Sequence, residues 1–400
     1  MNIIPELRFS EFEKDGEWRT KTLGDIVDSE SSSLALNKIE LRVKGYSVYG
    51  ADSVVGYIDD YHQEDKYISI VKDGSGVGRL KLCEPKSSIL GTLAYIKSKD
   101  KKEYILDWIY YLMNTINFNS YKKGSGIPHI YFSDFKIESV GVPKPTEQRK
   151  IASCLTSLDE LIAAQNDKLE AFKDHKKGLL QSLFPQEGET VPEVRFPEFE
   201  GKGEWKPSTV EDTCLVKGRI GYRGYTKQDL VKDGEGVLVL GGKNIQNQLL
   251  DLSDRTFLSW DKYYESPEIM VKMNHIIFSQ RGTLGDCAII DKEIGKATIN
   301  PSMVLLRDIT CNPKFLYYIL IGNTVQEEVT RNSTSSAVPM LSQKQIREFS
   351  FLIPHPSEQD KIASALSALD ELLIAQQKKI DELQEHKKGL MQGLFPTIER

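Results

Sequence analysis

The chain has 400 residues, of which 40% are hydrophobic and 28% charged, with a formal net charge of −6. This length predicts two or three domains of ordinary globular composition. The acidic balance gives no support to nucleic-acid binding, because proteins of that class usually carry net positive charge. No run of eighteen apolar residues predicts a membrane span, and the acidic segment 1–12 does not resemble a secretory signal. Five scattered cysteines without a CxxC pair predict neither a zinc site nor a disulfide framework, and they favour a cytoplasmic location.

A short motif opens the chain and returns in its middle. PELRF at 5–9 with GEW at 16–18 is echoed by PEVRF at 192–196 with GEW at 203–205. Each copy precedes a block of mixed composition. Because an internal repeat of this kind marks two copies of one structural plan, we expect a pseudo-two-fold molecule.

The first block predicts a mixed α/β domain. A β-rich run at 46–58 precedes the apolar run and glycine loop IVKDGSGVGR at 70–79. An amphipathic helix is expected around 108–112, and the small-residue loop GSGIP follows at 124–128. Without the flanking residues of a phosphate-binding motif, these glycine loops are expected to be turns.

A long helix is predicted next. From 147 to 185 the chain carries EQ, KIAS, LDEL, AQ, HKKG and LFP in that order. Apolar or semi-apolar residues recur at alternating steps of four and three, which is a heptad pattern. We call these positions the seam: Ile151, Leu155, Leu158, Ile162, Gln165, Leu169, Phe172, Lys176, Leu179 and Leu183.

The second block follows the plan of the first with different side chains. It contains a β-rich run at 236–240, the glycine loop IFSQRGTLG at 277–285 and a helix around 315–319. Asn312-Pro313 predicts the start of that helix, and SSAVP at 335–339 closes the block. The plan is therefore shared, while the loops differ.

The long helix then returns at 358–396, at a constant offset of 211 residues (358 minus 147), with its seam in the same register. Thr146 and Ser357 are expected to be N-caps, and Phe-Pro to end each helix. One apolar stripe on so long a helix needs a partner, and the simplest partner is its twin. We expect an antiparallel coiled coil in which Gln165 and Gln376 meet near the middle and set the register; the alternative is that both amides bind water at the seam edge.

Two equivalent helices and two divergent domains describe a spacer that carries two different readers. A ligand with fixed spacing between two unlike parts suits this plan, and DNA is such a ligand. The fold class expected is therefore α/β, with two recognition domains separated by the coiled coil. The domain boundaries expected are 1–146 and 186–357 for the recognition domains, and 147–185 and 358–400 for the helices.

The motifs together resemble the specificity subunit of type I restriction–modification systems. The resemblance rests on PELRF…GEW, VPKPTEQRKIAS and HKKGLLQSLFP with their repeats, and it covers essentially the whole chain. It implies a subunit that recognises an asymmetric bipartite DNA site, with one domain for each half. It also implies partners: two methyltransferase subunits that use S-adenosylmethionine, and restriction subunits that use ATP with magnesium. No cofactor is expected in this chain itself.

No catalytic or metal-binding set is predicted. The chain lacks an Asn/Asp-Pro-Pro-aromatic tetrapeptide, and Gly241-Gly242-Lys243-Asn244 lacks the spacing of a phosphate-binding loop. His175 and His386 occupy twin helix positions and are expected to be structural. These absences favour recognition over an enzyme. The competing interpretation is a coiled-coil scaffold that displays two protein- or glycan-binding domains, which the acidic net charge supports.

The residues expected to contact DNA are polar, cationic or aromatic side chains on loops, because such groups read base edges and bind phosphates. In the first domain they are Tyr46, Tyr49, Lys72, Ser75, Arg79, Lys122, Lys123 and Ser125. In the second they are Arg219, Tyr222, Arg223, Tyr225, Lys243, Asn244, Gln280, Arg281, Arg331 and Asn332. Four off-seam apolar residues of the helices are expected to dock methyltransferase subunits, unless they widen the core stripe: Leu161, Leu180, Leu372 and Met391.

Overall fold

The computed structural model describes residues 3–124, 126–333 and 339–396, with all side chains in these ranges except that of Tyr222. The chain divides into two compact units. The first unit comprises Met1–Asp167 together with Gln377–Arg400, and the second comprises Lys168–Gln376. Both long helices therefore begin in one unit and end in the other.

The first unit contains a mixed α/β domain built on a four-stranded antiparallel sheet in the order β2-β8-β5-β6. A three-stranded sheet, β4-β3-β7, and the pair β1-β9 complete it. The strands are β1 (Arg19–Thr22), β2 (Val27–Ser31), β3 (Tyr46–Tyr49), β4 (Val54–Ile58), β5 (Tyr67–Val71), β6 (Leu80–Cys83), β7 (Ser88–Ile89), β8 (Leu93–Ser98) and β9 (Ser139–Val142). The helices are η1 (Ser10–Phe12), α1 (Leu23–Ile26), η2 (Leu36–Lys38), α2 (Leu106–Asn114), η3 (Phe118–Tyr121) and α3 (Phe132–Phe135).

The second unit repeats this topology with additions. Its sheet β11-β20-β17-β18 matches β2-β8-β5-β6 in order and direction, and β10-β21 matches β1-β9. The strands are β10 (Lys206–Thr209), β11 (Leu215–Gly218), β12 (Leu230–Val231), β13 (Val237–Leu240), β14 (Ile245–Gln246), β15 (Leu249–Leu250), β16 (Phe257–Leu258), β17 (Ile276–Ser279), β18 (Cys287–Ile289), β19 (Ala297–Ile299), β20 (Met303–Arg307) and β21 (Ser350–Ile353). The helices are η4 (Pro197–Phe199), α5 (Val210–Thr213), η5 (Gly221–Arg223), η6 (Lys227–Asp229), η7 (Gly242–Asn244), α6 (Trp260–Tyr264), η8 (Pro267–Ile269), α7 (Pro313–Ile321), α8 (Asn323–Ser333) and α9 (Gln343–Glu348).

The predicted domain helices are confirmed, and their cores explain why they form. α2 packs Trp108, Ile109 and Leu112 into the core of the first unit, where all three are buried. α7 begins as predicted, with Pro313 in the first turn and the Asn312 side chain accepting the Phe315 N–H at 3.0 Å. The mixed α/β class is therefore confirmed in both units.

The two long helices are α4 (Pro145–Ser182) and α10 (Pro356–Leu394). Each begins one residue before its predicted cap, so Thr146 and Ser357 lie inside the first turn and the N-cap prediction was wrong. The reason is that proline occupies the first helical position, where its missing N–H costs no hydrogen bond. All twenty seam positions are buried or half-buried, which confirms the heptad pattern.

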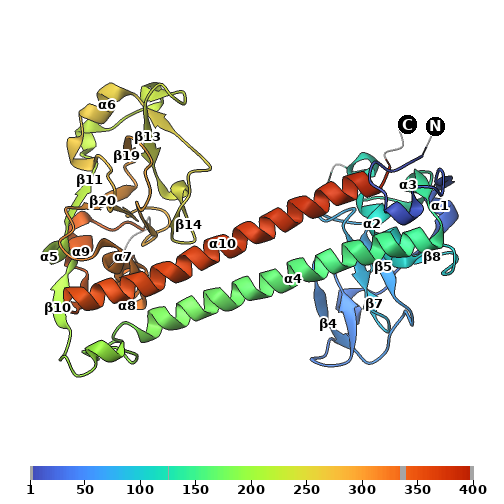
Figure 1. Cartoon of the computed structure of the whole chain (residues 1–400), viewed down its shortest axis with the longest axis horizontal. Helices are drawn as coiled ribbons and strands as arrows, with labels where there is room; N and C mark the ends of the chain where they lie inside the picture. Colours follow the sequence, from blue (N-terminus) through green and yellow to red (C-terminus); the bar gives the residue numbers. More distant parts are fainter. Residues whose placement is uncertain (1–2, 125, 334–338, 397–400) are drawn as a thin grey trace. The chain divides into compact units, whose positions relative to one another are not determined.

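The antiparallel pairing of the helices is seen within each unit (Figure 1). In the first unit, Leu155 of α4 shares a core with Leu390 of α10, and four residues later Asp159 pairs with Lys387 at 2.5 Å. In the second unit, Leu179 shares a core with Leu366, and Lys176 pairs with Asp370 at 2.5 Å. In each unit, a step of four residues forward along one helix thus matches a step of three residues back along the other, which is the antiparallel direction. Gln165 and Gln376 fall in different units, so their role in register stays a prediction.

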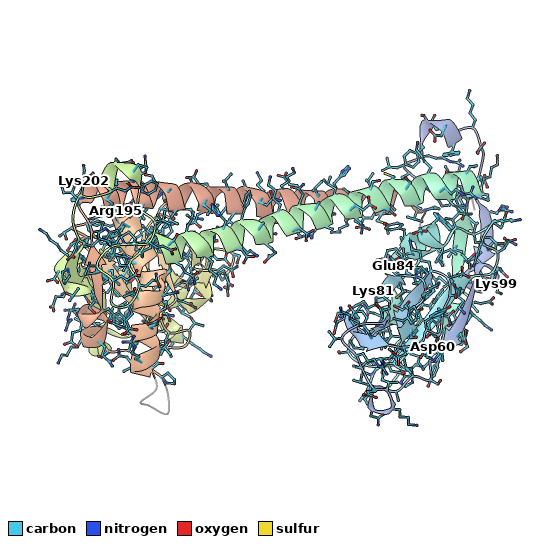
Figure 2. The ribbon with its side chains drawn as sticks, turned by 90° about the horizontal axis from the view of Figure 1, so that it is seen from below. Asp60, Lys81, Glu84, Lys99, Arg195 and Lys202 are labelled. Carbon is cyan, nitrogen blue, oxygen red and sulfur yellow. The ribbon has the colours of Figure 1, made fainter. Side chains whose placement is uncertain are left out.

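The repeated EQ dipeptide ties each long helix to its domain. Glu147 is 1% exposed and receives two hydrogen bonds from the Arg8 guanidinium, both at 2.8 Å. Arg195 binds Glu358 in the same bidentate way at 2.7 and 2.8 Å (Figure 2 labels Arg195). The entry motif supplies both arginines. This explains why the motif and the helix repeat together: a charge-assisted, two-pronged contact fixes orientation as well as distance.

Candidate nucleic-acid interface

The candidate site in the first domain is built from two segments that lie side by side. The glycine loop after β5 is joined to segment 122–131 by hydrogen bonds from Gly74 N–H to the Pro128 carbonyl and from Ile130 N–H to the Lys72 carbonyl, both 2.9 Å. Gly78 turns the loop at a φ of +89°, and a Cβ there would lie 2.5 Å from Phe118. Glycine is therefore required at this turn.

These contacts bring five of the predicted residues of the first domain together. Lys72, Ser75 and Arg79 lie on the loop, and Lys122 and Lys123 lie on the adjoining segment. Ser75, Arg79, Lys122 and Lys123 are exposed, and Lys72 is half-buried. Ser125 lies outside the described residues.

The two predicted tyrosines of β3 have different environments. Tyr49 is 7% exposed, and Lys81 lies over its ring at 4.9 Å. Burial raises the pKa of its hydroxyl, and the ring is part of a hydrophobic cluster with Tyr67 and Tyr95. Tyr46 is half-buried and meets Tyr61 edge to face at 4.8 Å. We therefore keep Tyr46 as a candidate and regard Tyr49 as a core residue, because a buried ring cannot reach a groove.

The equivalent loop of the second domain has the same backbone arrangement. Leu341 N–H bonds the Gln280 carbonyl at 3.0 Å, as Ile130 bonds Lys72, and Arg281 bridges Met340 as Asp73 bridges His129. Gln280 and Arg281 thus occupy the backbone positions of Lys72 and Asp73. At the first position the cation Lys72 corresponds to the amide Gln280, and at the second the carboxylate Asp73 corresponds to the cation Arg281. Arg281 is exposed, while the Gln280 amide donates to the Pro301 carbonyl at 3.0 Å.

The segment 217–225, in which cations alternate with glycine and aromatics, is partly structural. Arg219 is 9% exposed and donates to Thr298 Oγ1 at 3.1 Å and to the Ile299 carbonyl, with its guanidinium 5.1 Å from the centre of the Tyr225 ring. Burial lowers the pKa of Arg219. The predicted contact of Arg219 with DNA is replaced by a structural role, because protein groups already surround the buried guanidinium. Tyr225 is half-buried, and its contact with DNA stays a prediction. Arg223 remains at the surface and pairs with Glu268 at 3.4 Å; the Tyr222 side chain lies outside the described part.

Asn244 and Lys243 also differ in burial: the first is buried and the second is exposed. Asn244 is fully buried; its side chain accepts the Gly241 N–H and donates to the carbonyls of Asp251 and Asp254. Both amide hydrogens are already donated and the side chain is inaccessible, so this candidate is corrected to a turn-forming residue. Lys243 is exposed and reaches Asp254 at 2.6 Å and Thr256 Oγ1 at 2.9 Å.

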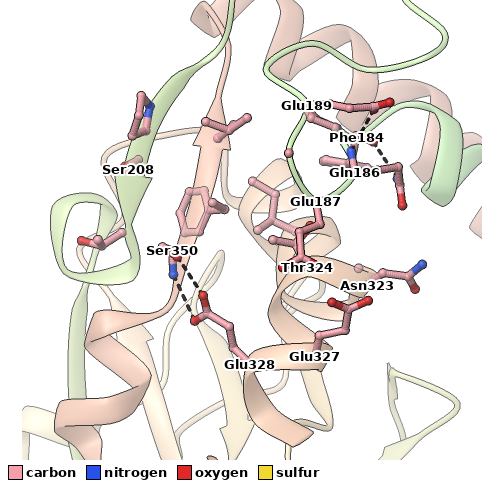
Figure 3. Close-up of a pocket in the computed structure, with 18 of the residues that line it drawn as sticks. Phe184, Gln186, Glu187, Glu189, Ser208, Asn323, Thr324, Glu327, Glu328 and Ser350 are labelled. Carbon is pink, nitrogen blue, oxygen red and sulfur yellow. Dashed lines mark hydrogen bonds between the residues drawn. The ribbon is translucent and has the colours of Figure 1, made fainter. Parts of the chain in front are cut away.

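Arg331 and Asn332 lie in a different setting, next to each other on α8. Arg331 lines a pocket of about 570 Å³, of which Figure 3 labels four glutamates. Most of its charged lining residues are acidic: Glu187, Glu189, Asp212, Glu327 and Glu328. Arg331 lines it too and pairs with Glu327 at 3.1 Å, and the Asn332 amide donates to the Glu328 carbonyl at 2.8 Å. Such a lining repels phosphate, so neither residue is kept as a DNA contact.

Two side chains near the first-domain loop, one half-buried and one exposed, were not predicted from the sequence. His129 and Tyr131 stack edge to face at 5.0 Å, and Lys123 lies 5.8 Å from the centre of the Tyr131 ring. Tyr131 is 52% exposed. An aromatic residue beside lysines is typical of nucleic-acid surfaces, but in the sequence it reads as part of a buried strand.

The four predicted docking residues divide in a symmetrical way. Leu161 and Leu372, which are twins, are 42% and 51% exposed. The other twin pair, Leu180 and Met391, lies further along the two helices and is half-buried against the hydrophobic cores of the second and first units. The prediction for Leu180 and Met391 is corrected, since they widen the core stripe.

Comparison with known proteins decides the family. The family model for the type I restriction modification DNA specificity domain matches residues 15–171 and 202–385. The chain belongs to this family. The specificity subunit of the type I restriction enzyme MjaVIII from Methanocaldococcus jannaschii is 21% identical over 95% of this chain and 92% of its own length. A second protein of that organism, the putative type I restriction enzyme MjaX specificity subunit, is 22% identical over 95% and 93%.

Solved structures agree on the fold. The S subunit of a type I system from M. genitalium superposes with a TM-score of 0.67 at 18% identity, over 99% of this chain and 100% of that one. A chain from a structural study of type I complex assembly gives 0.56 at 13% identity, over 94% and 97%. The family and the fold expected from the repeated motifs are confirmed, and the non-DNA scaffold is not favoured.

Within the described ranges, no group of three or more His, Cys, Asp or Glu side chains is arranged to hold a metal ion. In the same part of the chain no helix combines the length and apolarity needed to cross a bilayer.

Proposed function

We propose that this specificity subunit reads an asymmetric, bipartite DNA site, with the domain at 1–146 reading one half and the domain at 186–357 the other. The observation that carries the proposal is the pair of equivalent loops. Lys72 and Asp73 in one domain, and Gln280 and Arg281 in the other, project from the same backbone site with different chemistry. Equivalent scaffolds with unlike reading groups suit unlike half-sites.

The residues proposed to contact DNA are candidates whose side chains are exposed or half-buried. In the first domain they are Tyr46, Lys72, Ser75, Arg79, Lys122 and Lys123, to which the structure adds His129 and Tyr131. In the second they are Arg223, Lys243, Gln280 and Arg281. The contacts predicted for Ser125, Tyr222 and Tyr225 remain predictions from the sequence. Arginine and glutamine suit guanine and adenine edges in the major groove, while lysine suits phosphates.

The twin leucines 161 and 372 support a second part of the proposal. Each lies on the exposed side of a long helix, where a large apolar residue has no structural role. We propose that each docks one methyltransferase subunit, giving two per chain, and that restriction subunits join this complex. S-adenosylmethionine and ATP with magnesium would be bound by those partners.

The experiment that tests the reading role uses Arg281→Ala in the full chain with its methyltransferase partner. Affinity for the cognate duplex should fall about tenfold or more, with relaxed preference in the second half-site only. Thr283→Ala, an exposed neighbour on the same loop, serves as the control. Unchanged affinity and preference for Arg281→Ala at matched salt would remove this loop from the interface.

A further inference from the structure

Most candidate cations of the proposed interface are paired with carboxylates of their own domain. Arg79 pairs with Asp52 in the β3–β4 turn, and Lys123 pairs with Asp134 of α3 at 2.6 Å. In the second domain, Lys243 pairs with Asp254 at 2.6 Å and Arg223 with Glu268 at 3.4 Å. Of the candidate cations in the described ranges, Lys122 and Arg281 have no carboxylate partner.

We infer that these carboxylates, above all Asp52 and Asp254, are specificity-determining residues that weaken sequence-independent binding to DNA. The inference rests on the proposed function, because it takes Arg79 and Lys243 to face the duplex. It gives some of the acidic residues of a chain of net charge −6 a role at the interface.

The physical argument concerns what a phosphate meets as it approaches. A cation with a carboxylate at contact distance presents almost no net charge beyond the Debye length of about 8 Å at physiological salt. A phosphate must therefore displace the carboxylate or share the cation with it. Random duplex offers no base contacts in return, so it gains little. A cognate half-site adds base contacts, which offset the loss of the internal pair.

Both pairs are suited to exchange because they are at the surface. The Arg79 and Asp52 side chains are 54% and 81% exposed, and those of Lys243 and Asp254 are 41% and 67% exposed. Exposed pairs contribute little to folding, so breaking one leaves the domain intact. Neither carboxylate has a cap or core role in the described structure that would retain it for stability.

A control substitution with the same change in charge is available in the sheet β2-β8-β5-β6 of the first domain. Glu30 of β2 pairs with Lys97 of β8 at 3.2 Å, and both side chains are exposed. Strand β2 is the edge of the sheet opposite β6, which begins directly after Arg79. Figure 2 shows Lys81 of β6 and Lys99, which follows β8, on opposite sides of the first domain. Glu348 of α9, which pairs with Lys344, is the control in the second domain.

The test measures binding of the full chain to a random-sequence duplex by fluorescence anisotropy over a range of salt concentrations. Asp52→Asn and Asp254→Asn should each bind at least about threefold more tightly than Glu30→Gln and Glu348→Gln, which carry the same net charge. The salt dependence should steepen by up to about 0.9 in the logarithmic slope for each variant. The double variant Asp52→Asn/Arg79→Ala should lose the gain.

The outcomes separate the two levels of the hypothesis. If Arg79→Ala binds random duplex as tightly as the parent chain, Arg79 does not face DNA and that part of the proposed function fails. If Arg79→Ala binds more weakly but Asp52→Asn and Asp254→Asn match their controls, the interface stands and the role of the carboxylates is overturned. A gain that persists in the double variant would also overturn it.

Discussion

Lys176 of α4 and Asp370 of α10 form an ion pair at 2.5 Å in which the two side chains are only 14% and 12% exposed. The Asp370 carboxylate also accepts a hydrogen bond at 2.6 Å from Tyr318, whose hydroxyl pKa is raised by burial. In the twin pair of Lys387 with Asp159, the Asp159 carboxylate likewise accepts a hydrogen bond from the Tyr111 hydroxyl at 2.7 Å. This pair is more exposed: the Lys387 side chain is 28% exposed and that of Asp159 is 36% exposed. The heptad seam is thus held in each unit by a Tyr–Asp–Lys cluster, and the two clusters differ in burial.

The difference in burial predicts unequal stability effects. Lys176→Met leaves Asp370 shielded without its cation, so the free energy of unfolding should fall by about 3 kcal/mol. Lys387→Met should cost about 1 kcal/mol or less, because water reaches that pair. Urea unfolding of both variants measures this. Equal losses would show that burial does not decide the strength of these pairs.

The two arginine–glutamate anchors predict that lysine cannot replace arginine. Arg195→Lys loses one prong of the contact with Glu358 and the bond to the Gly203 carbonyl at 2.8 Å. The free energy of unfolding should fall by about 2 kcal/mol. Arg19→Lys is the control, because its pair with Glu103 is exposed and should lose under 0.5 kcal/mol by the usual scale of surface pairs. A stable Arg195→Lys variant would mean that charge alone holds the entry motif.

A buried histidine predicts acid sensitivity. His275 is 8% exposed, and burial, aided by Arg307, lowers its pKa from 6.5 to about 4. Its neutral Nδ1 accepts the Lys272 N–H at 3.3 Å. Because the folded pKa lies below the unfolded one, this residue's contribution to stability is complete above pH 6.5 and is lost as the pH falls towards 4. The expected loss is about 3 kcal/mol at the lower end.

The variant His275→Gln tests that assignment by unfolding between pH 7 and 4. Its stability should depend less on pH over this window than that of the parent chain, while the exposed His175→Gln should follow the parent. Parallel curves for all three proteins would contradict the buried, neutral state of His275.

The exposed leucines predict methyltransferase stoichiometry. Leu161→Asp or Leu372→Asp should each reduce the complex from two methyltransferase subunits per chain to one, as measured by mass photometry. Unfolding of the isolated chain should be unchanged, since neither side chain is buried. Ala171→Asp, an exposed charge on the same helix, is the control. Two bound subunits in every variant would place docking elsewhere.

Periodic features were predictable from the sequence and most single contacts were not. The heptad positions, including Lys176 and Lys387, were correctly placed because burial on a helix follows spacing. The predicted start of α4 was wrong by one residue. Pro145 is the first helical residue, because proline suits that position better than Thr146 suits the N-cap.

The sequence could not show which candidate DNA contacts are exposed and which are buried, because the burial of a polar residue depends on partners far away in the chain. Arg219 is enclosed by Thr298 and Ile299, some eighty positions away, and Asn244 by a turn that its own side chain organises. In contrast, the loop pair at 72 and 280 was predictable, since its glycines fix a turn wherever the strand ends. The equivalence of Asp73 and Arg281 emerged only from backbone hydrogen bonds.

The most direct measurement of the central claim is the map of methylated adenines made by this chain with its partner methyltransferase, compared with that of a chimera carrying another family member's domain in place of 206–353. The parent should methylate one asymmetric site in two parts, and the chimera should keep one half and the gap while changing the other half. A site that is symmetric in the parent, or changed in both halves or neither by the exchange, would contradict two independent readers on a common spacer.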